Sequence, residues 1–260
     1  MRHAKRQAMA QDAAKKDEDR KSRGRPLLRG AVTLVFLGLM GFGGWQALMH
    51  PDTPLPEAWN PTKPLRISDP VTPLTGWKLN RTAAVGAACL AALDGHAALQ
   101  SMADLEATSQ CHIRDRIDLR GVGQARLAGV ETRCAIALRM AMWERHSLQP
   151  AARNLLGTDL TGIDHFGSYS CRAMRTGAGP SSRMSTHATA DAIDIAGFRF
   201  ADGRSVRLLS GWDGDSAEAA FLRAARDGAC DWFNLTLSPD YNRLHADHFH
   251  LQSTGWGLCR

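Results

Sequence analysis

The chain has 260 residues, of which 44% are hydrophobic, and a formal net charge of +6. Residues 1–30 hold ten Lys and Arg and four acidic residues, so this short segment carries the whole net charge and the remainder is neutral. The length and composition are typical of one globular domain with attached segments. The neutral remainder argues against a nucleic-acid-binding domain, so nucleic acid is not an expected partner.

The first predicted feature is a membrane anchor behind a basic tail. Residues 1–29 are polar and charge-dense, and we expect them to be disordered and cytoplasmic. Residues 31–49 contain no charged side chain, and about 20 such residues span a bilayer as a helix. The positive-inside rule then predicts a transmembrane anchor over 30–50 with the rest of the chain outside the cytoplasm. A cleaved signal peptide is the alternative, disfavoured by the long charged N-terminal region and the lack of a clear Ala-x-Ala site.

A proline-rich segment follows the predicted anchor. Residues 51–76 contain seven prolines, at positions 51, 54, 56, 61, 64, 70 and 73. This density disfavours helix and predicts a stiff, extended linker between the membrane and a domain over residues 77–260.

The cysteines indicate an oxidising compartment. All six follow the apolar segment, and an even number on the exported side favours disulfides. We predict nearest-neighbour pairing as Cys89–Cys111, Cys134–Cys171 and Cys230–Cys259. Zinc binding by these cysteines is the disfavoured alternative, because the chain has no Cys-x-x-Cys pair.

Within the domain, helices are predicted first and strands later. The Ala-rich segment 82–99 reads as a helix, and 131–156 reads as a helix or helix pair that stops at Gly157. A later helix begins at Asp213 or Asp215, runs through Arg226 and ends at Gly228.

Strands are predicted around 167–174, 192–200, 204–209 and 247–253, and Asp202-Gly203 is a strong hairpin signal. Helices followed by strands predict an α+β class.

Two short segments, 185–194 and 245–250, contain the candidate functional side chains. If 192–196 is a strand, Ile193 and Ile195 face the core and Asp194 faces the other side. If 247–251 is a strand, His248 and His250 share one face. His187 lies in the loop before the first strand.

Imidazole and carboxylate groups together are ligands for a divalent metal such as zinc, and three protein ligands plus water form the catalytic arrangement. Pairing of the two strands would bring His187, Asp194 and either His248 or His250 onto one metal. The remaining histidine would then lie beside the bound water, as a general base or a transition-state stabiliser.

The spacing of these residues also resembles that of known protein families. Ser-x-His-(x)6-Asp followed by His-x-His resembles the zinc signature shared by D-Ala-D-Ala carboxypeptidases, murein endopeptidases and the hedgehog N-domain. The segment from Gly167 to Cys259 more closely resembles the bacterial extensin-like C-terminal family. The matching pieces are Tyr169-Ser-Cys-Arg172, Ser185-x-His-Ala188, Ala192-Ile-Asp-Ile195, Asp202-Gly203, Cys230-x-x-Phe233, Ser238-Pro-Asp-Tyr-Asn242 and His245-x-Asp-His-Phe-His250.

The resemblance implies a small antiparallel sheet with flanking helices and one zinc ion bound by His187, Asp194 and His250. It places His248 beside the bound water and makes His245 a further active-site histidine.

Two more residues receive roles from the same resemblance. Ser185 is expected to hydrogen-bond within the site. Arg172 is a candidate for binding a substrate carboxylate or the polarised carbonyl, because a guanidinium suits both. A structural salt bridge is the alternative for Arg172.

The chain departs from the family patterns at Ala190, where Gly is common, at Asp191, where Asn is common, and at Gln252, where Asp is expected. The carboxypeptidases place a Glu base where this chain has Asp247. The general base is therefore either Asp247 or His248. Strand alternation turns Asp247 away from the site and so favours His248.

The expected function is a zinc-dependent hydrolase of peptidoglycan peptides, anchored in the bacterial inner membrane by helix 31–49 with its domain in the periplasm. The alternative is a non-catalytic envelope-binding module with the same fold. A structural cell-wall protein is disfavoured, because the chain has no Ser-Pro-Pro-Pro-Pro repeats. The sequence does not predict which bond is cleaved or the oligomeric state.

Overall fold

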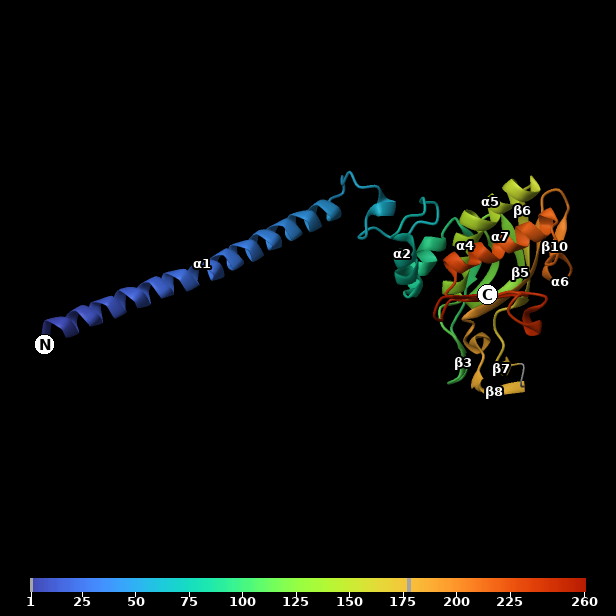
Figure 1. The fold of residues 1–260 in the computed structure, drawn as a ribbon. Coiled ribbons are helices and arrows are strands. Elements are labelled where there is room, and N and C mark those ends of the chain that lie inside the picture. The colour runs from blue at the N-terminus through green and yellow to red at the C-terminus, as the bar shows by residue number, and fades with distance from the viewer. Residues whose placement is uncertain (1, 177–178) are drawn as a thin grey trace. The chain divides into compact units, whose positions relative to one another are not determined.

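The computed structural model describes residues 2–176 and 179–260, which fall into two units divided between Pro56 and Glu57. The first unit contains helix α1 (Arg2–Met49; Figure 1). The basic segment 1–29, expected to be disordered, is helical from Arg2 onward, because it is rich in Ala, Lys, Arg and Gln, which favour helix. Within the described residues, Arg29–Met49 is the one stretch long and apolar enough to cross a membrane.

The second unit takes in most of the proline-rich segment. Leu65 and Ile67 are buried in its core, and Thr72 Oγ1 donates a hydrogen bond to the Ala58 carbonyl (3.1 Å). The extended spacer expected over 51–76 is therefore not found beyond Pro56, where the chain packs as part of the second unit. Proline limits regular structure, but it does not prevent the apolar residues between the prolines from packing.

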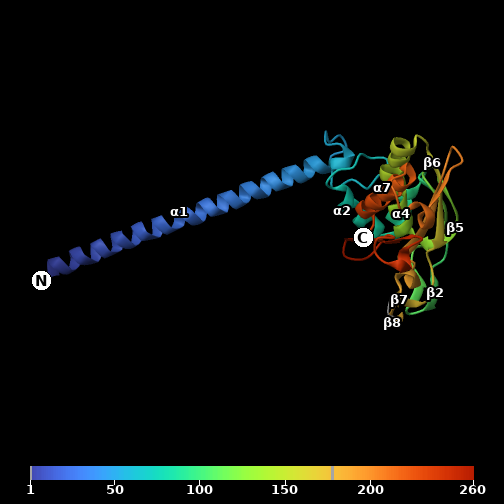
Figure 2. The ribbon, with the colours of Figure 1, turned by 45° about the vertical axis from the view of Figure 1, so that its right-hand side comes forward.

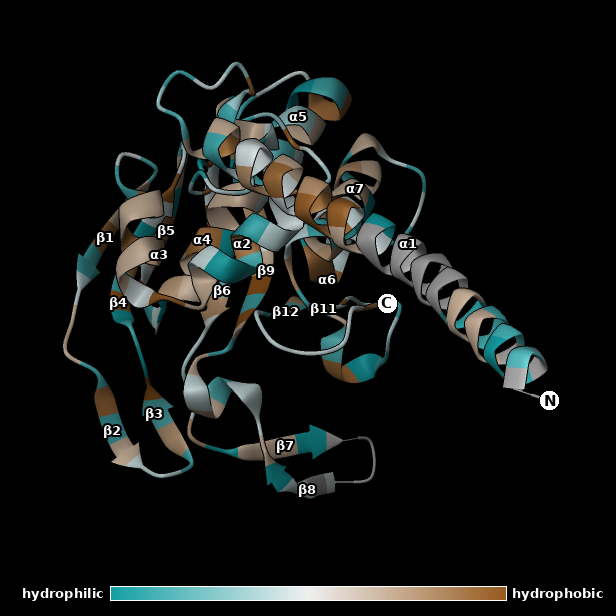
Figure 3. Ribbon diagram, turned by 90° about the vertical axis from the view of Figure 1, so that its left-hand side faces the viewer, coloured by the Kyte–Doolittle hydropathy of each residue, from teal (hydrophilic) through white to brown (hydrophobic). Residues whose placement is uncertain are grey.

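A mixed sheet forms the centre of the second unit. Among the described residues it has nine strands, mostly antiparallel, with β5–β6 and β11–β13 parallel. In spatial order they are β1 (Ala97–Ser101), β4 (Arg116–Val122), β5 (Ala125–Arg133), β6 (Leu160–Gly167), β9 (Ala192–Phe200), β12 (Phe249–Gln252), β11 (Leu235–Leu237) and β13 (Leu258–Cys259), with β10 (Ser205–Arg207) against β9. Two hairpins lie apart from it, β2 (Leu105–Thr108) with β3 (Cys111–Ile113) and β7 (Ala173–Thr176) with β8 (Gly179–Met184; Figure 3).

Helices cover one face of this sheet, so the fold is α and β mixed, as predicted. Helices α4 and α7 lie together on one side of β5 and β6 (Figure 2). The helices of this unit are α2 (Thr75–Ala83), α3 (Gly86–Leu93), α4 (Cys134–Trp143), α5 (Gln149–Ala151), α6 (Leu208–Gly211) and α7 (Ala217–Trp232). Wider π-helical turns extend α4 over Glu144–Leu148 and α5 over Ala152–Leu156.

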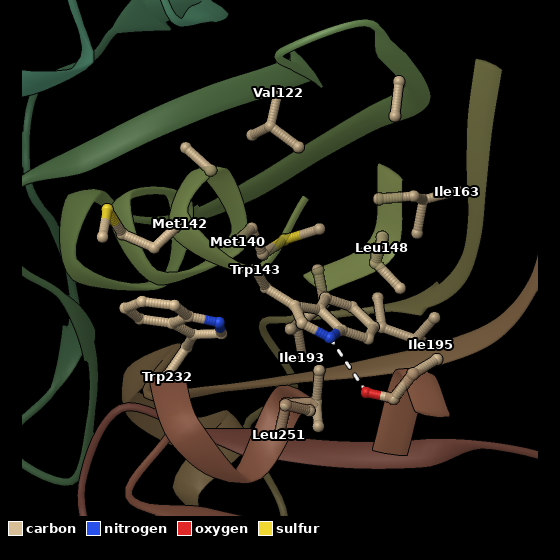
Figure 4. Close-up of a cluster of buried hydrophobic side chains, with 14 of the residues drawn as sticks. Val122, Met140, Met142, Trp143, Leu148, Ile163, Ile193, Ile195, Trp232 and Leu251 are labelled. Atoms are coloured by element: carbon tan, nitrogen blue, oxygen red, sulfur yellow. Dashed lines mark hydrogen bonds between the residues drawn. The ribbon is translucent and has the colours of Figure 1, made fainter. Parts of the chain in front are cut away.

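The core lies between the helices and the sheet. Ile193, Ile195 and Leu251 surround the buried Trp143 ring (Figure 4). The indole Nε1 of Trp143 donates to the Ala225 carbonyl at 2.9 Å, so this buried polar group is satisfied. Phe198 packs edge-on against Trp143, with ring centroids 5.8 Å apart.

A bulge in β9 determines what faces away from the helices. Ile193 and Ile195 are buried, but beyond Ala196 the buried residues are Phe198 and Phe200, so the alternation changes phase. The pairing of β9 with β6 shifts register at the same place. Asp194 and Arg199 therefore both lie on the face of the sheet that the helices leave open, which we call the open face.

Most of the later elements follow the sequence, but the strand predicted over 167–174 falls mainly in the loop between β6 and β7. β9 covers the predicted 192–200, the Asp202-Gly203 hairpin forms, and Gly157 ends its helix in a left-handed conformation with φ +67°. Gly228 does not end α7, which continues to Trp232. A Cβ at Gly228 would overlap Ser147, so this glycine permits close helix packing.

The earlier part differs from the prediction. Strands β1–β5 occupy 97–133, so the expected order of helices first and strands later is wrong, and the helix predicted over 82–99 ends at Leu93. The buried Ile117 and Leu119 alternate with the outward Asp118 and Arg120, which is a period-two pattern.

The disulfides correct two predicted pairs. The bonds are Cys89–Cys134, Cys111–Cys171 and Cys230–Cys259, with Cα atoms 6.1, 5.4 and 5.6 Å apart. Only the last was predicted. Pairing follows packing rather than sequence order, because α3 packs against α4 and β3 lies beside the turn Thr186–Thr189.

We expect Phe198→Ala to lower the free energy of unfolding by about 3–5 kcal/mol, because it empties a fully buried site between three aromatic rings. Urea denaturation followed by tryptophan fluorescence would measure the change. Leu209→Ala is the control, since Leu209 is 72% exposed and its loss should cost less than about 0.5 kcal/mol. Equal effects of the two substitutions would contradict the packing described.

Candidate metal centre

Two paired strands place the first two ligand candidates. His250 on β12 lies directly opposite Asp194 on β9 in an antiparallel register. Phe249 and Leu251 are fully buried on the helix side, so both polar side chains project from the open face. Side chains directly opposite on one face lie within contact distance, which is why this register brings an imidazole against a carboxylate.

A short helical turn places the third. His187 lies in η4 (Thr186–Thr189), where the Ser185 hydroxyl accepts a hydrogen bond from the His187 backbone N–H at 3.3 Å. The turn ends at Ala190 with φ +50°, a left-handed conformation that is unfavourable for a residue with a Cβ. This conformation explains why glycine suits the position, and Ala190 adopts it at some cost in free energy.

The three side chains converge. The candidate ligand atoms of His187, Asp194 and His250 lie within 4.8 Å of one another. His250 Nδ1 is 2.8 Å from Asp194 Oδ1, and His187 Nε2 is 3.2 Å from both Asp194 Oδ2 and His250 Nδ1. Burial raises the pKa of Asp194, but the close imidazoles of His187 and His250 outweigh it and hold that pKa well below its usual value, so this carboxyl group is ionised.

The protonation of His187 fits a cation at this point. His187 Nδ1 is 2.7 Å from the Ser168 carbonyl, which can only accept, so Nδ1 carries the proton. The neutral ring then directs the lone pair of Nε2 toward the carboxylate of Asp194, which also has no proton to donate. A divalent cation held by both would satisfy the two acceptors, and two imidazoles with one carboxylate suit zinc.

His248 lies beside this cluster. Its Nε2 is 3.6 Å from Asp194 Oδ1, and its Nδ1 donates to Asp247 Oδ1 at 2.7 Å. Asp247 was expected to point away, but it lines the same cleft as His248. Strand β12 begins only at Phe249, so strict alternation does not extend back to Asp247.

His245 lies on η5 (Arg243–His245), next to the other histidines. Its Nδ1 donates to Asn242 Oδ1 at 2.8 Å, and its ring centroid is 5.2 Å from that of His248. Burial, with the neighbouring His248 and His250, lowers the pKa of His245 to about 4, so this imidazole is neutral near pH 7.

These residues line a cleft of about 520 Å³, together with side chains from the β7–β8 hairpin and the 237–247 segment. Arg172 lines it just before β7, and its guanidinium pairs with no carboxylate in the part of the chain described. The salt-bridge alternative for Arg172 therefore finds no partner here. A cleft with an unpaired guanidinium near a polar cluster can accept an anionic group.

A family model described as the extensin-like protein C-terminus matches residues 87–260. The chain belongs to this family. No curated protein and no solved structure matches it. All six cysteines and every residue of the cleft lie within the matched range of the extensin-like domain.

The extensin-like domain also contains supporting residues to which the sequence assigned no role. Asp191 pairs with Arg133 (2.5 Å), accepts a hydrogen bond from Thr189 Oγ1 (2.6 Å), and its carbonyl accepts from the Ser253 N–H (2.9 Å). These contacts join β5, η4 and the end of β12, and so fix the three ligand candidates relative to one another. The residue type alone gave no such signal, because the role of Asp191 depends on contacts with segments that lie far apart in the chain, around Arg133 and Ser253.

Gln252 is the second such residue. Its amide Nε2 is 3.0 Å from Nε2 of His250. With the amide turned so that its oxygen faces the ring, Gln252 would accept the Nε2 proton and leave Nδ1 free to bind a metal. Its departure from the expected Asp was visible in the sequence, but its contact with His250 was not.

Proposed function

We propose that this extensin-like protein is a zinc-dependent hydrolase that cleaves peptide bonds of peptidoglycan from an anchor in the inner membrane. The convergence of His187, Asp194 and His250, with the His187 tautomer set by the Ser168 carbonyl, carries the proposal. The same ligand pattern supports a relation to the D-Ala-D-Ala carboxypeptidase, murein endopeptidase and hedgehog superfamily.

The roles of the residues follow from their contacts. Zinc held by the three ligands would activate a water molecule and polarise a carbonyl. In its neutral form His248 donates Nδ1–H to Asp247, which leaves the Nε2 lone pair directed toward the ligand cluster, where it would accept the proton of the attacking water. Asp247 orients that ring and stabilises its charged form, and Arg172 binds a carboxylate or the reacting carbonyl.

The location and substrate rest on separate features. The apolar Arg29–Met49 stretch after a basic tail supports an inner-membrane anchor with a cytoplasmic N-terminus. Three disulfides support a periplasmic domain. An anchored periplasmic hydrolase lies next to peptidoglycan, whose peptides carry the carboxylates that Arg172 would bind.

The test uses the full chain in detergent, loaded with zinc and incubated with purified muropeptides. We expect new peptide products by mass spectrometry, their loss on chelation and their return with added zinc. Zinc binding without any product would favour the alternative, a binding module that keeps the metal. Absence of both zinc and products would refute the proposal.

We expect Gln252→Leu to weaken zinc binding by about 10–100-fold, because it removes the partner that fixes the proton of His250 on Nε2. Zinc titration against a competing chelator would measure the affinity. Gln100→Leu is the matched control, on an exposed position of β1. An affinity unchanged by Gln252→Leu would contradict this role.

A further inference from the structure

A second depression lies on the open face of the sheet. It has a volume of about 700 Å³ and is lined by residues of β5, β6, β9 and β10, including Arg126, Arg199 and Arg207. We call it the arginine groove. It is separate from the cleft of the candidate metal centre, and the proposed chemistry uses none of its charged residues.

The charges in the arginine groove are unbalanced. Asp164 is its single acidic lining residue, 3.0 Å from Arg199 Nε and 3.8 Å from Arg207 Nη2. Arg126 is exposed, and its guanidinium pairs with no carboxylate among the residues described. The groove thus holds three guanidinium groups and one carboxylate, which contacts two of them.

The rest of the open face is different. On β4 and β5, Arg116 pairs with Glu131 at 2.5 Å, and Arg120 pairs with Asp118 at 2.8 Å. These arginines are matched one to one with acids, as expected for a solvated sheet face. Arginines in excess of acids on this face therefore lie in the groove and, as Arg172, in the adjoining cleft, and not on β4 or the paired part of β5.

The groove adjoins the cleft through Phe166. This side chain is 61% exposed and lines both depressions, and its ring lies edge-on to His248 with centroids 5.9 Å apart. Asp194 and Arg199 lie on the same face of β9, five residues apart, which is about 16 Å at about 3.3 Å per residue. A peptide of a few residues that crosses Phe166 would reach from the ligand cluster to the arginines.

We infer that the arginine groove binds the carboxylates of an extended acidic peptide whose neighbouring bond lies at the candidate metal centre. Guanidinium groups bind carboxylates through two parallel hydrogen bonds, and Arg126 offers all its donors. The exposed Phe166 ring supplies an apolar contact for the peptide between the two depressions. The inference rests on the proposed function, which it extends by assigning a substrate class: peptides with several free carboxylates.

The experiment measures binding without turnover. Full-length His187→Ala protein in detergent is treated with chelator and photolabelled with hexaglutamate that carries a benzophenone. Mass spectrometry then separates labelled peptides of β5, β6 and β10 from those of the basic tail, which also attracts the probe. We expect saturable labelling of the strands, and about a tenfold higher half-saturating concentration when Arg126→Gln and Arg207→Gln are added.

Matched controls make the result specific. Arg120→Gln removes a paired arginine from the same face and should leave strand labelling unchanged, and Arg126→Lys, which keeps the charge, should retain most of it. Absent strand labelling, labelling unaffected by the double substitution, or equal labelling by a hexaglutamine probe would overturn the inference. Muropeptide cleavage is measured separately, on protein that keeps His187. If the strands are not labelled but this protein cleaves muropeptides, the inference fails and the proposed function stands. If the strands are labelled but no muropeptide is cleaved, the result counts against the proposed function alone.

Discussion

His187→Ala is expected to abolish zinc binding and hydrolysis together. The substitution removes one of three ligand atoms that lie within 4.8 Å of one another and leaves the carboxylate of Asp194 opposite a void. The loss of affinity should exceed the about 10–100-fold that removal of a ligand's hydrogen-bond partner costs. Metal analysis of purified protein and muropeptide profiling would measure the two effects.

The control for this substitution is His96→Ala, which removes an imidazole outside the cleft and should leave zinc content and activity unchanged. A His187→Ala protein that retains one zinc per chain would show that the metal is bound elsewhere. Thermal unfolding of the variant would show that it is correctly folded, since His187 is buried and its loss leaves a void.

His248→Ala is expected to separate metal binding from turnover. Its Nε2 lies 3.6 Å from Asp194, outside the cluster of three ligand candidates, so the variant should keep its zinc. The rate should fall by about 10²–10⁴-fold, the usual contribution of a positioned acid or base. Steady-state hydrolysis of a defined muropeptide, with metal content measured on the same sample, would show both.

Asp247→Asn tests the partner of that ring. An amide can still contact His248 Nδ1 at this position, but it no longer stabilises the protonated imidazole, so we expect a smaller fall in rate than for His248→Ala. A larger fall for Asp247→Asn would instead make Asp247 the base, which was the alternative that the sequence left open. Unchanged rates for both variants would remove these residues from the chemistry.

The sequence allowed prediction of those site residues that lie on regular strands. Period-two alternation directs Asp194 and His250 to one face and Ile193, Phe249 and Leu251 to the other, and this local rule holds in the structure. His187 lies on a short turn, where no periodicity acts, so its place in the chain before the strand made it a candidate without giving its direction. The choice of His250 over His248 as the third ligand depended on the resemblance to a known zinc signature.

Features that depend on tertiary packing escaped prediction. The Ser168 carbonyl that sets the His187 tautomer is a backbone group with no sequence signal. The disulfide pairs follow the contact of α3 with α4, which lies between segments far apart in the chain. Asp247 precedes its strand, so alternation gave the wrong direction, and the bulge near Ala196 aligned Arg199 with Asp194 in a way that simple alternation did not predict.

The proposed hydrolase requires that His187, Asp194 and His250 together bind one zinc ion. Crystals of the protein grown with zinc, measured on both sides of the zinc absorption edge, test it most directly. We expect a single anomalous peak about 2.0–2.2 Å from His187 Nε2, an Asp194 carboxylate oxygen and His250 Nδ1. Zinc-grown crystals with no peak at that position, or with their only strong peak elsewhere, would contradict the claim.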